Sequence, residues 1–184
     1  MNNVIIVEGA KRTGKSYLLG KLDVPTFKIP FVDYFHGVMG KEGERGEANR
    51  DVHWLNAGCD LAVLSLAKSG NLKGLVIDRG PVSNIVFAVM QNRITEDEGL
   101  VHLDWLADNG YFDDIHLVLV KAGVNVPERN KDAWEVLDPK VEASLLERYM
   151  DRLSVGWSLD VKKITNNYDG KSIERFKGLI NGLI

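Results

Sequence analysis

The stretch that decides the fold is Gly9-Ala10-Lys11-Arg12-Thr13-Gly14-Lys15-Ser16, which directly follows the run Val4-Ile5-Ile6-Val7-Glu8. It fits the pattern G-x-x-x-x-G-K-[ST] of loops that bind phosphate groups. The two fixed glycines allow backbone conformations and a close approach to a ligand that a side chain would prevent. A strand-like apolar run precedes the loop and a short helical segment follows it, which is the context the pattern requires. We therefore predict a phosphate-binding loop at residues 9–16.

The positions within this loop predict both a ligand and a reaction. The N–H groups of residues 9–16 would converge on phosphate oxygens, and the following helix would add its N-terminal dipole. Lys15 would reach the outer phosphates and the Ser16 hydroxyl would ligate Mg²⁺. Arg12 is placed to stabilise the charge that spreads over a phosphoryl group during transfer. The loop thus indicates ATP and Mg²⁺ as cofactors.

Composition narrows the class of protein. The chain has 184 residues, of which 45% are hydrophobic and 27% charged, as in a soluble globular protein of one domain, residues 1–184. Its net charge of −3 gives no general attraction to nucleic acid or to an anionic membrane. A single cysteine, Cys59, excludes an intramolecular disulfide and favours a reducing, cytoplasmic setting. The apolar runs are too short to cross a membrane, so we expect no membrane association.

Apolar runs and helical patterns alternate along the chain. Strands are expected at residues 4–7, 26–32, 75–77, 115–120 and 161–165. Pro30 cannot donate a ladder hydrogen bond, so the second of them should lie at a sheet edge or stop early. The pattern predicts an α/β fold with three layers, a five-stranded parallel sheet with helices on both faces. The carboxyl ends of the strands then share one edge with the phosphate loop, and functional residues are expected there.

Two helices carry specific expectations about their buried faces. Asp51 is a candidate cap for a helix that ends near residue 69. Helical spacing predicts that its buried face holds Val52, Leu55, Cys59, Ala62, Val63 and Leu66. Asp138-Pro139 opens a later helix, whose expected apolar face holds Val141, Leu145, Tyr149 and Leu153.

Two segments without strong apolar patterning are expected to be exposed. Residues 36–50 are rich in glycine and charge, which predicts either a mobile loop over the substrate or an ordinary surface loop. Residues 122–137 form a lid-like segment in which Arg129 is a candidate to close on the nucleotide. An exposed loop arginine without that role is an equally good interpretation.

Four residues outside the loop are candidates for chemistry. Asp78 ends a predicted strand and is placed to hold Mg²⁺ directly or through water. Arg79 follows it and can bind phosphate oxygens with its fork of donors. Asp33 would serve as general base if the acceptor is a hydroxyl, whereas a phosphate acceptor needs none. Trp54 is a candidate substrate contact, although a lone aromatic more often packs in a core.

Two motifs resemble those of thymidylate kinases. Residues 4–16 resemble the start of that family in the form with an arginine inside the phosphate loop, and residues 76–88 resemble its Asp-Arg segment. Residues 52–55 echo the preceding helix, and the order of elements is similar over nearly the whole chain. The resemblance implies transfer of the terminal phosphoryl of ATP, with Mg²⁺, to a deoxynucleoside monophosphate. It implies that Arg79 holds the acceptor phosphate, and the family often forms homodimers.

The sequence departs from that family on the acceptor side. Lys11 stands where the family usually has an aspartate that contacts the sugar, and Asp60 where it has an arginine for the acceptor phosphate. Asn56 lies near the position of a phenylalanine that stacks on thymine, and Gly80 replaces an aromatic residue. The leading hypothesis is an ATP-dependent nucleotide kinase acting on a (deoxy)nucleoside monophosphate. The alternatives are a kinase of a nucleoside or a polynucleotide 5′-hydroxyl, with Asp33 as base, and a nucleotide-binding module without transfer activity.

Overall fold

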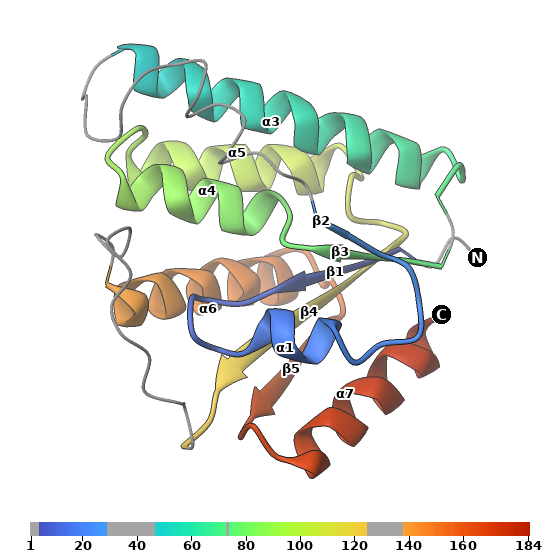
Figure 1. The fold of residues 1–184 in the computed structure, drawn as a ribbon. Helices are drawn as coiled ribbons and strands as arrows, with labels where there is room; N and C mark the ends of the chain where they lie inside the picture. The colour runs from blue at the N-terminus through green and yellow to red at the C-terminus, as the bar shows by residue number, and fades with distance from the viewer. Residues whose placement is uncertain (1–3, 29–46, 73, 125–137) are drawn as a thin grey trace.

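The computed structural model of the chain describes residues 4–28, 47–72, 74–124 and 138–184. Their sheet holds five parallel strands: β1 (Val4–Glu8), β2 (Thr26–Lys28), β3 (Leu75–Asp78), β4 (Ile115–Ala122) and β5 (Val161–Asn166). The strand order is β2-β3-β1-β4-β5, with β1 in the centre and β2 at one edge (Figure 1). The α/β fold class and the edge position of the second strand are confirmed.

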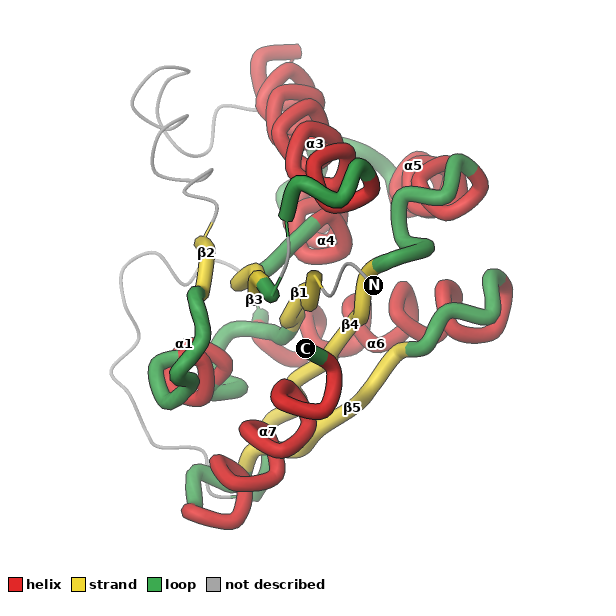
Figure 2. The backbone as a smooth tube through the Cα atoms, turned by 90° about the vertical axis from the view of Figure 1, so that its right-hand side faces the viewer, coloured by secondary structure: helices red, strands yellow, loops and turns green. Residues whose placement is uncertain are grey.

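Helices cover both faces of the sheet. They are α1 (Lys15–Leu19), α3 (Glu47–Lys68), α4 (Pro81–Met90), α5 (Glu96–Asp108), α6 (Pro139–Gly156) and α7 (Gly170–Leu183). Figure 2 shows α1 and α7 on one side of the strands and α3, α4, α5 and α6 on the other. The three layers agree with the prediction.

The side chains of β1 explain why both faces are covered. Every residue of β1 is buried, and successive side chains of a strand point to opposite faces. Val4 and Ile6 belong to the core under α3, α4, α5 and α6, whereas Ile5 and Val7 belong to the core under α1 and α7. A strand at the centre of the sheet is covered on both faces, so it needs apolar side chains at consecutive positions.

Helix α3 differs from the prediction in its start. It begins at Glu47, so the expected cap, Asp51, lies inside the helix, and residues 47–50 of the expected 36–50 loop are helical. Residues 36–46 lie outside the described residues. The physical reason is local: the last glycine of the loop is Gly46, and glutamate, alanine and arginine, which favour helices, follow it.

The buried face of α3 was predicted only in part: Val63 packs partly buried against the core and Cys59 is half-buried, and the side chain of Val52 lies outside the described ones. Leu55 and Leu66 are 43% and 46% exposed, and the buried positions are instead His53, Asn56, Ala57, Asp60, Leu64 and Ala67. The inward face carries polar side chains over its first half. The spacing of apolar residues therefore pointed to a neighbouring face of the helix. A polar stripe inside a helix layer needs partners or a ligand, and it lies beside the candidate site described below.

Helix α6 begins as predicted. The Asp138 side chain accepts a hydrogen bond from the Lys140 N–H at 2.8 Å, and Pro139 occupies the first turn. Its apolar face includes Leu145, Tyr149 and Leu153, but Val141 is 49% exposed and Glu142 is buried in its place. No helix among the described residues is long and apolar enough to cross a membrane.

Candidate active site

The phosphate loop follows β1 at the carboxyl edge of the sheet, as predicted. A Cβ atom on Gly9 would lie 2.9 Å from both the Thr13 hydroxyl and the Val120 carbonyl oxygen, so only glycine fits against β4 here. The Thr13 hydroxyl donates to the Ala10 carbonyl at 3.0 Å and closes the loop on itself. The loop is therefore built by close backbone packing, as the sequence pattern requires.

Gly14 ends the loop in a conformation that favours glycine. Its φ is +74°, and an added Cβ would meet the Asn166 amide nitrogen and, at 2.7 Å, the Tyr168 ring. Arg12 also has a positive φ, 68°, which a non-glycine residue rarely adopts. Such strained backbone is often found at functional sites, and here it turns the loop towards helix α1.

Two residues at and after the end of the last strand hold the loop from outside. Asn166 donates from its amide nitrogen to the Thr13 carbonyl at 2.9 Å, and the Tyr168 hydroxyl donates to the Arg12 carbonyl at 2.6 Å. The Tyr168 N–H in turn donates to the Asn166 amide oxygen at 2.9 Å. We call Asn166 and Tyr168 the loop brace. Sequence analysis missed it, although an asparagine at the carboxyl end of the last strand was a usable signal.

Lys15 and Asp78 form an ion pair beside the loop. Asp78 ends β3 and lies in register with Val7 of β1, which brings the carboxylate to the start of the loop. The Lys15 and Asp78 side chains are only 5% and 10% exposed, so solvent screens the pair weakly. The structure thus brings together Lys15 and Asp78, which the sequence proposed from separate motifs.

The donors around this pair suit a nucleotide with Mg²⁺. Gly9 and Gly14 have no Cβ, so phosphate groups can approach the backbone of the loop closely. Ser16, the first residue after Lys15, is exposed, and Asp78 supplies a carboxylate. Hydroxyl and carboxylate oxygens are the ligands that Mg²⁺ prefers, and phosphates and waters usually complete its shell. Among the described residues no three His, Cys, Asp or Glu side chains cluster as a metal site.

Glu8 connects the loop strand to helix α4. Gly80, the residue before the helix, has no side chain to cap it. Glu8 supplies the cap: its carboxylate accepts from the Gly80 N–H at 3.1 Å, from the Ser83 N–H at 3.3 Å and from the Ser83 hydroxyl. Burial raises the pKa of Glu8, and the hydrogen bonds from Ser83 oppose that rise. The contact fixes the β3–α4 turn against the phosphate loop.

Arg79 occupies that turn in a left-handed conformation, with φ of 70°. Its guanidinium lies 4.8 Å from the Phe87 ring centre and 3.4 Å from the Ser83 hydroxyl. It also forms a 3.2 Å ion pair with Glu142 of α6. The arginine is thus held beside the loop by groups from two helices.

Glu142 makes a second contact, with the phosphate loop itself. One carboxylate oxygen accepts from the backbone N–H of Lys11 at 2.9 Å while the other faces Arg79. The Glu142 side chain is 1% exposed. Sequence analysis missed this residue; the signal was a charged residue three positions before Leu145, on the same apolar stripe.

The polar stripe of α3 faces α4 next to Glu8. The Asn84 amide nitrogen donates to both oxygens of Asp60 at 2.9 and 2.8 Å. Burial raises the pKa of Asp60 to about 8. The hydrogen bond from Asn84 lowers this pKa in part, and the charge of Glu8 raises it further. Burial lowers the pKa of His53 to about 4, with smaller effects from His102 and Arg93. The His53 ring nitrogens and the Asn56 amide oxygen are buried without a hydrogen-bond partner among the described residues.

Three candidates from the sequence remain. Asp33 and Arg129 lie outside the described residues. Trp54 is 57% exposed, and its ring centre lies 4.9 Å from that of His53 and 5.9 Å from that of His102. Its predicted contact with a substrate stays a prediction.

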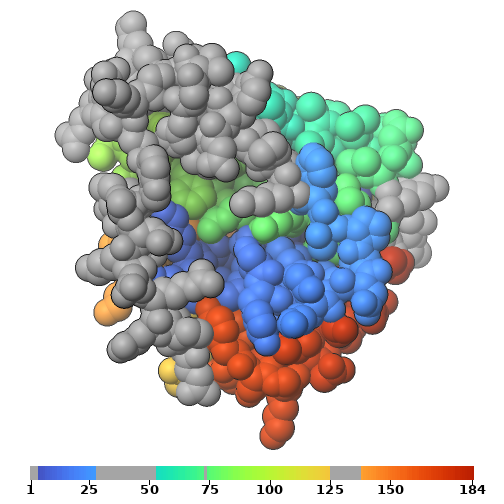
Figure 3. Space-filling model, in the orientation of Figure 1, coloured from blue at the N-terminus to red at the C-terminus, as the bar shows by residue number. Residues whose placement is uncertain are grey.

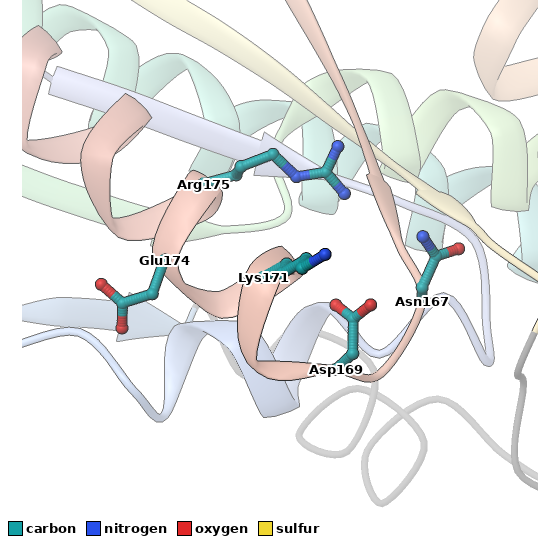
Figure 4. Close-up of a pocket in the computed structure, with 5 residues that line it drawn as sticks. All are labelled: Asn167, Asp169, Lys171, Glu174 and Arg175. Atoms are coloured by element: carbon teal, nitrogen blue, oxygen red, sulfur yellow. The ribbon is translucent and has the colours of Figure 1, made fainter.

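The surface view places the loop region centrally on one face. In Figure 3 the blue N-terminal segment lies between the green surface of α3 and α4 and the red surface of α7. A separate open hollow lies at the start of α7, and Figure 4 shows that Glu174 points away from its other lining residues. The hollow is lined by Asn167, Asp169, Lys171, Glu174 and Arg175. It carries none of the predicted site residues.

With its glycine-cradled loop and five-stranded parallel sheet, the chain has an α/β P-loop fold that solved structures share. Two solved structures show the likeness. One is a deoxyadenosine kinase from M. mycoides with bound dATP, at TM-score 0.56 and 15% identity, covering 98% of this chain and 100% of that one. The other is the same enzyme with the products dCMP and a flexible dCDP, at TM-score 0.55 and 14% identity, covering 97% and 99%.

The two sequence comparisons gave no match. No model of a known protein family matches the chain. No curated protein matches it either. The likeness to the solved structures therefore describes the fold.

Proposed function

We propose that the chain is an ATP- and Mg²⁺-dependent phosphotransferase that acts on a nucleoside-type acceptor. The observation that carries the proposal is the Lys15–Asp78 pair, set directly behind a glycine-cradled loop. A buried lysine and a carboxylate at that place suit the outer phosphates of a nucleotide and its metal ion. Nucleotides bound in the structures of similar fold support the same assignment.

The residues of the site divide the work of transfer. Bound MgATP would supply the phosphoryl group and the metal charge that bridges its phosphates. Lys15 and the loop N–H groups other than that of Lys11, which donates to Glu142, would hold the phosphates, while Ser16 and Asp78 would hold the ion. Arg12 would stabilise charge on the transferring group. Phosphoryl transfer depends mainly on positioning and electrostatics, which a rigid, braced loop provides.

The favoured acceptor is the hydroxyl of a nucleoside. The name of the structural neighbours, deoxyadenosine kinase, supports a nucleoside. A hydroxyl acceptor needs a general base, and Asp33 remains the proposed one. A polynucleotide 5′-hydroxyl would use the same chemistry and belongs in the same test.

A thymidylate-kinase-like action on a nucleoside monophosphate is the second candidate. Arg79 favours it, because the guanidinium follows Asp78 beside the loop and could hold an acceptor phosphate. Its pairing with Glu142 weakens the case. The third candidate is a nucleotide-binding module without transfer activity.

A homodimer in the cytoplasm is part of the proposal. The side chains of Trp54, Leu55 and Leu66 on α3 and of Val101 and Trp105 on α5 are large, apolar and 43–69% exposed. Exposed apolar groups on neighbouring helices are typical of protein interfaces. Light scattering after gel filtration would give a mass of about one chain if this proposal is wrong.

One assay tests the proposed function. The purified protein is incubated with ATP and Mg²⁺ and with nucleosides, their 5′-monophosphates and 5′-hydroxyl oligonucleotides, and products are separated by chromatography. A phosphorylated nucleoside is the expected product, and it should disappear when Mg²⁺ is chelated. ATP binding without turnover of any acceptor would favour the binding module. Asp33→Asn should lower the rate with a hydroxyl acceptor, and an unchanged rate would remove Asp33 as the base.

A further inference from the structure

Glu142 places a fixed negative charge on two groups that are built to bind anions. Its carboxylate accepts from the Lys11 N–H at 2.9 Å and pairs with the Arg79 guanidinium at 3.2 Å. The first group belongs to the phosphate loop and the second to the turn that follows Asp78. A carboxylate bound through both oxygens in this way uses two donors that an anionic phosphate could otherwise bind.

The charge of Glu142 cannot readily withdraw to solvent. The side chain is 1% exposed, and it extends from the buried stripe of α6 that continues through Leu145, Leu146 and Tyr149. Asp138 and Pro139 fix the start of this helix only one turn earlier. Moving the carboxylate away would break both contacts and leave the Arg79 charge without this partner.

A neutral hydroxyl acceptor and a phosphorylated acceptor meet this arrangement differently. The acceptor phosphate of a monophosphate is an anion that would need Arg79, and it would have to displace a buried carboxylate or lie beside it. Like charges at such short separation inside a protein repel strongly. A nucleoside brings no second anion, so the Glu142–Arg79 pair can stay intact while the acceptor binds.

We propose that Glu142 is a specificity-determining residue that selects an unphosphorylated nucleoside over its 5′-monophosphate. The inference rests on the proposed function and deepens it, because it assigns the choice of acceptor to one charge. Arg79 then serves as the partner of Glu142 in the nucleoside complex. Removing the charge of Glu142 frees the guanidinium for an acceptor phosphate.

The experiment compares wild type with Glu142→Gln, which keeps the shape and an oxygen acceptor for the Lys11 N–H but removes the charge. Glu142→Asp keeps the charge on a shorter side chain. Glu147→Gln is the matched control: Glu147 lies on the same helix, 38% exposed, in a surface pair with Lys121. The measurement is kcat/KM for each deoxynucleoside and its 5′-monophosphate, together with the dissociation constant of each in the absence of ATP.

Wild type and Glu147→Gln should prefer the nucleoside by at least about tenfold. Glu142→Gln should shift this ratio towards the monophosphate by about tenfold or more, mainly through the KM of the monophosphate, and Glu142→Asp should not. A purely structural role would lower both values together and leave the ratio unchanged, which would overturn the inference.

The wild type alone keeps the inference testable if Glu142→Gln does not fold. Tighter binding or faster turnover of the monophosphate by wild type would overturn the inference while leaving the kinase assignment intact. Failure of the proposed function has a different signature, which is absence of phosphoryl transfer to every acceptor. In that case the dissociation constants decide: tenfold tighter monophosphate binding by Glu142→Gln supports the inference, and equal binding overturns it.

Discussion

The amide nitrogen of Asn166 donates a 2.9 Å hydrogen bond to the carbonyl oxygen of Thr13, a residue 153 positions earlier in the chain. Asn166 ends β5 and is fully buried, so the last strand of the sheet directly holds the phosphate loop. Tyr168 repeats the contact at the neighbouring carbonyl of Arg12. The loop conformation is therefore a property of the whole fold.

Asn166→Asp should weaken ATP binding and lower the free energy of unfolding. The carboxylate keeps an acceptor for the Tyr168 N–H but loses the donor to Thr13, and a buried acceptor left unsatisfied costs ~1–3 kcal/mol. Tyr168→Phe, which removes only the bond to Arg12, should cost less, ~1 kcal/mol. Urea unfolding and ATP titration provide the two measurements. Equal ATP affinity in both variants and wild type would show that the brace does not shape the loop.

Gly14→Ala should abolish nucleotide binding and destabilise the fold. The added Cβ would meet the Asn166 amide nitrogen and lie 2.7 Å from the Tyr168 ring, at a φ of +74°. Gly178→Ala is the control, because Gly178 lies in α7 and a Cβ added there would meet nothing within 4 Å. It should raise the free energy of unfolding by ~0.5–1 kcal/mol through helix propensity. A tolerated Gly14→Ala would mean that the loop relaxes freely.

Lys15→Ala should lower the rate of phosphoryl transfer by about 10²-fold or more, because it removes a preorganised charge from the outer phosphates. Lys163→Ala is the control, since Lys163 is half-exposed and pairs with Asp151 and Glu147 instead of the loop. Both rates are measured at saturating ATP and acceptor, with circular dichroism to confirm folding. A full rate in Lys15→Ala would overturn the assignment of the loop itself.

The sequence predicted what depends on local pattern. The loop was predictable because its glycines avoid clashes with residues close in the sequence. A Cβ added to Gly9, for example, would lie 2.9 Å from the Thr13 hydroxyl. The sheet was predictable because β1 is apolar at every position before Glu8. Asp78 was predictable as a partner of the loop because strands of a parallel sheet end at the same edge.

The missed residues act over long sequence distances. Glu142 lies 131 positions from Lys11, and no spacing rule connects an α6 carboxylate to a loop N–H. The face of α3 was predicted only in part for a related reason: Asp60 is buried because Asn84 of another helix satisfies it. A polar residue whose partner comes from elsewhere in the fold is assigned to the exposed face when periodicity alone is considered.

The buried carboxyl of Asp60 should make the free energy of unfolding depend on pH. Its pKa is about 8 in the folded chain against 3.8 as the ordinary value, so the folded state binds more protons between these values. Stability should therefore fall as pH rises towards 8, by ~1.4 kcal/mol per pH unit at most. His53, with a pKa of about 4 against 6.5, has the opposite effect between pH 4 and 6.5. Above pH 6.5 His53 no longer changes the free energy of unfolding with pH, so the effect of Asp60 is measured there without it.

Asp60→Asn isolates that contribution. Wild type should lose ~2 kcal/mol of unfolding free energy between pH 6.5 and 8, whereas the variant should show a flatter profile over the same interval. Glu8, whose pKa burial also raises, is present in both proteins; because its charge acts on Asp60, the difference between the two profiles reports Asp60 together with this coupling. Urea unfolding followed by circular dichroism at pH 6.5, 7.25 and 8 measures the slopes. Parallel profiles would show that Asp60 is already ionised at pH 6.5, with the charge held by the two hydrogen bonds from Asn84.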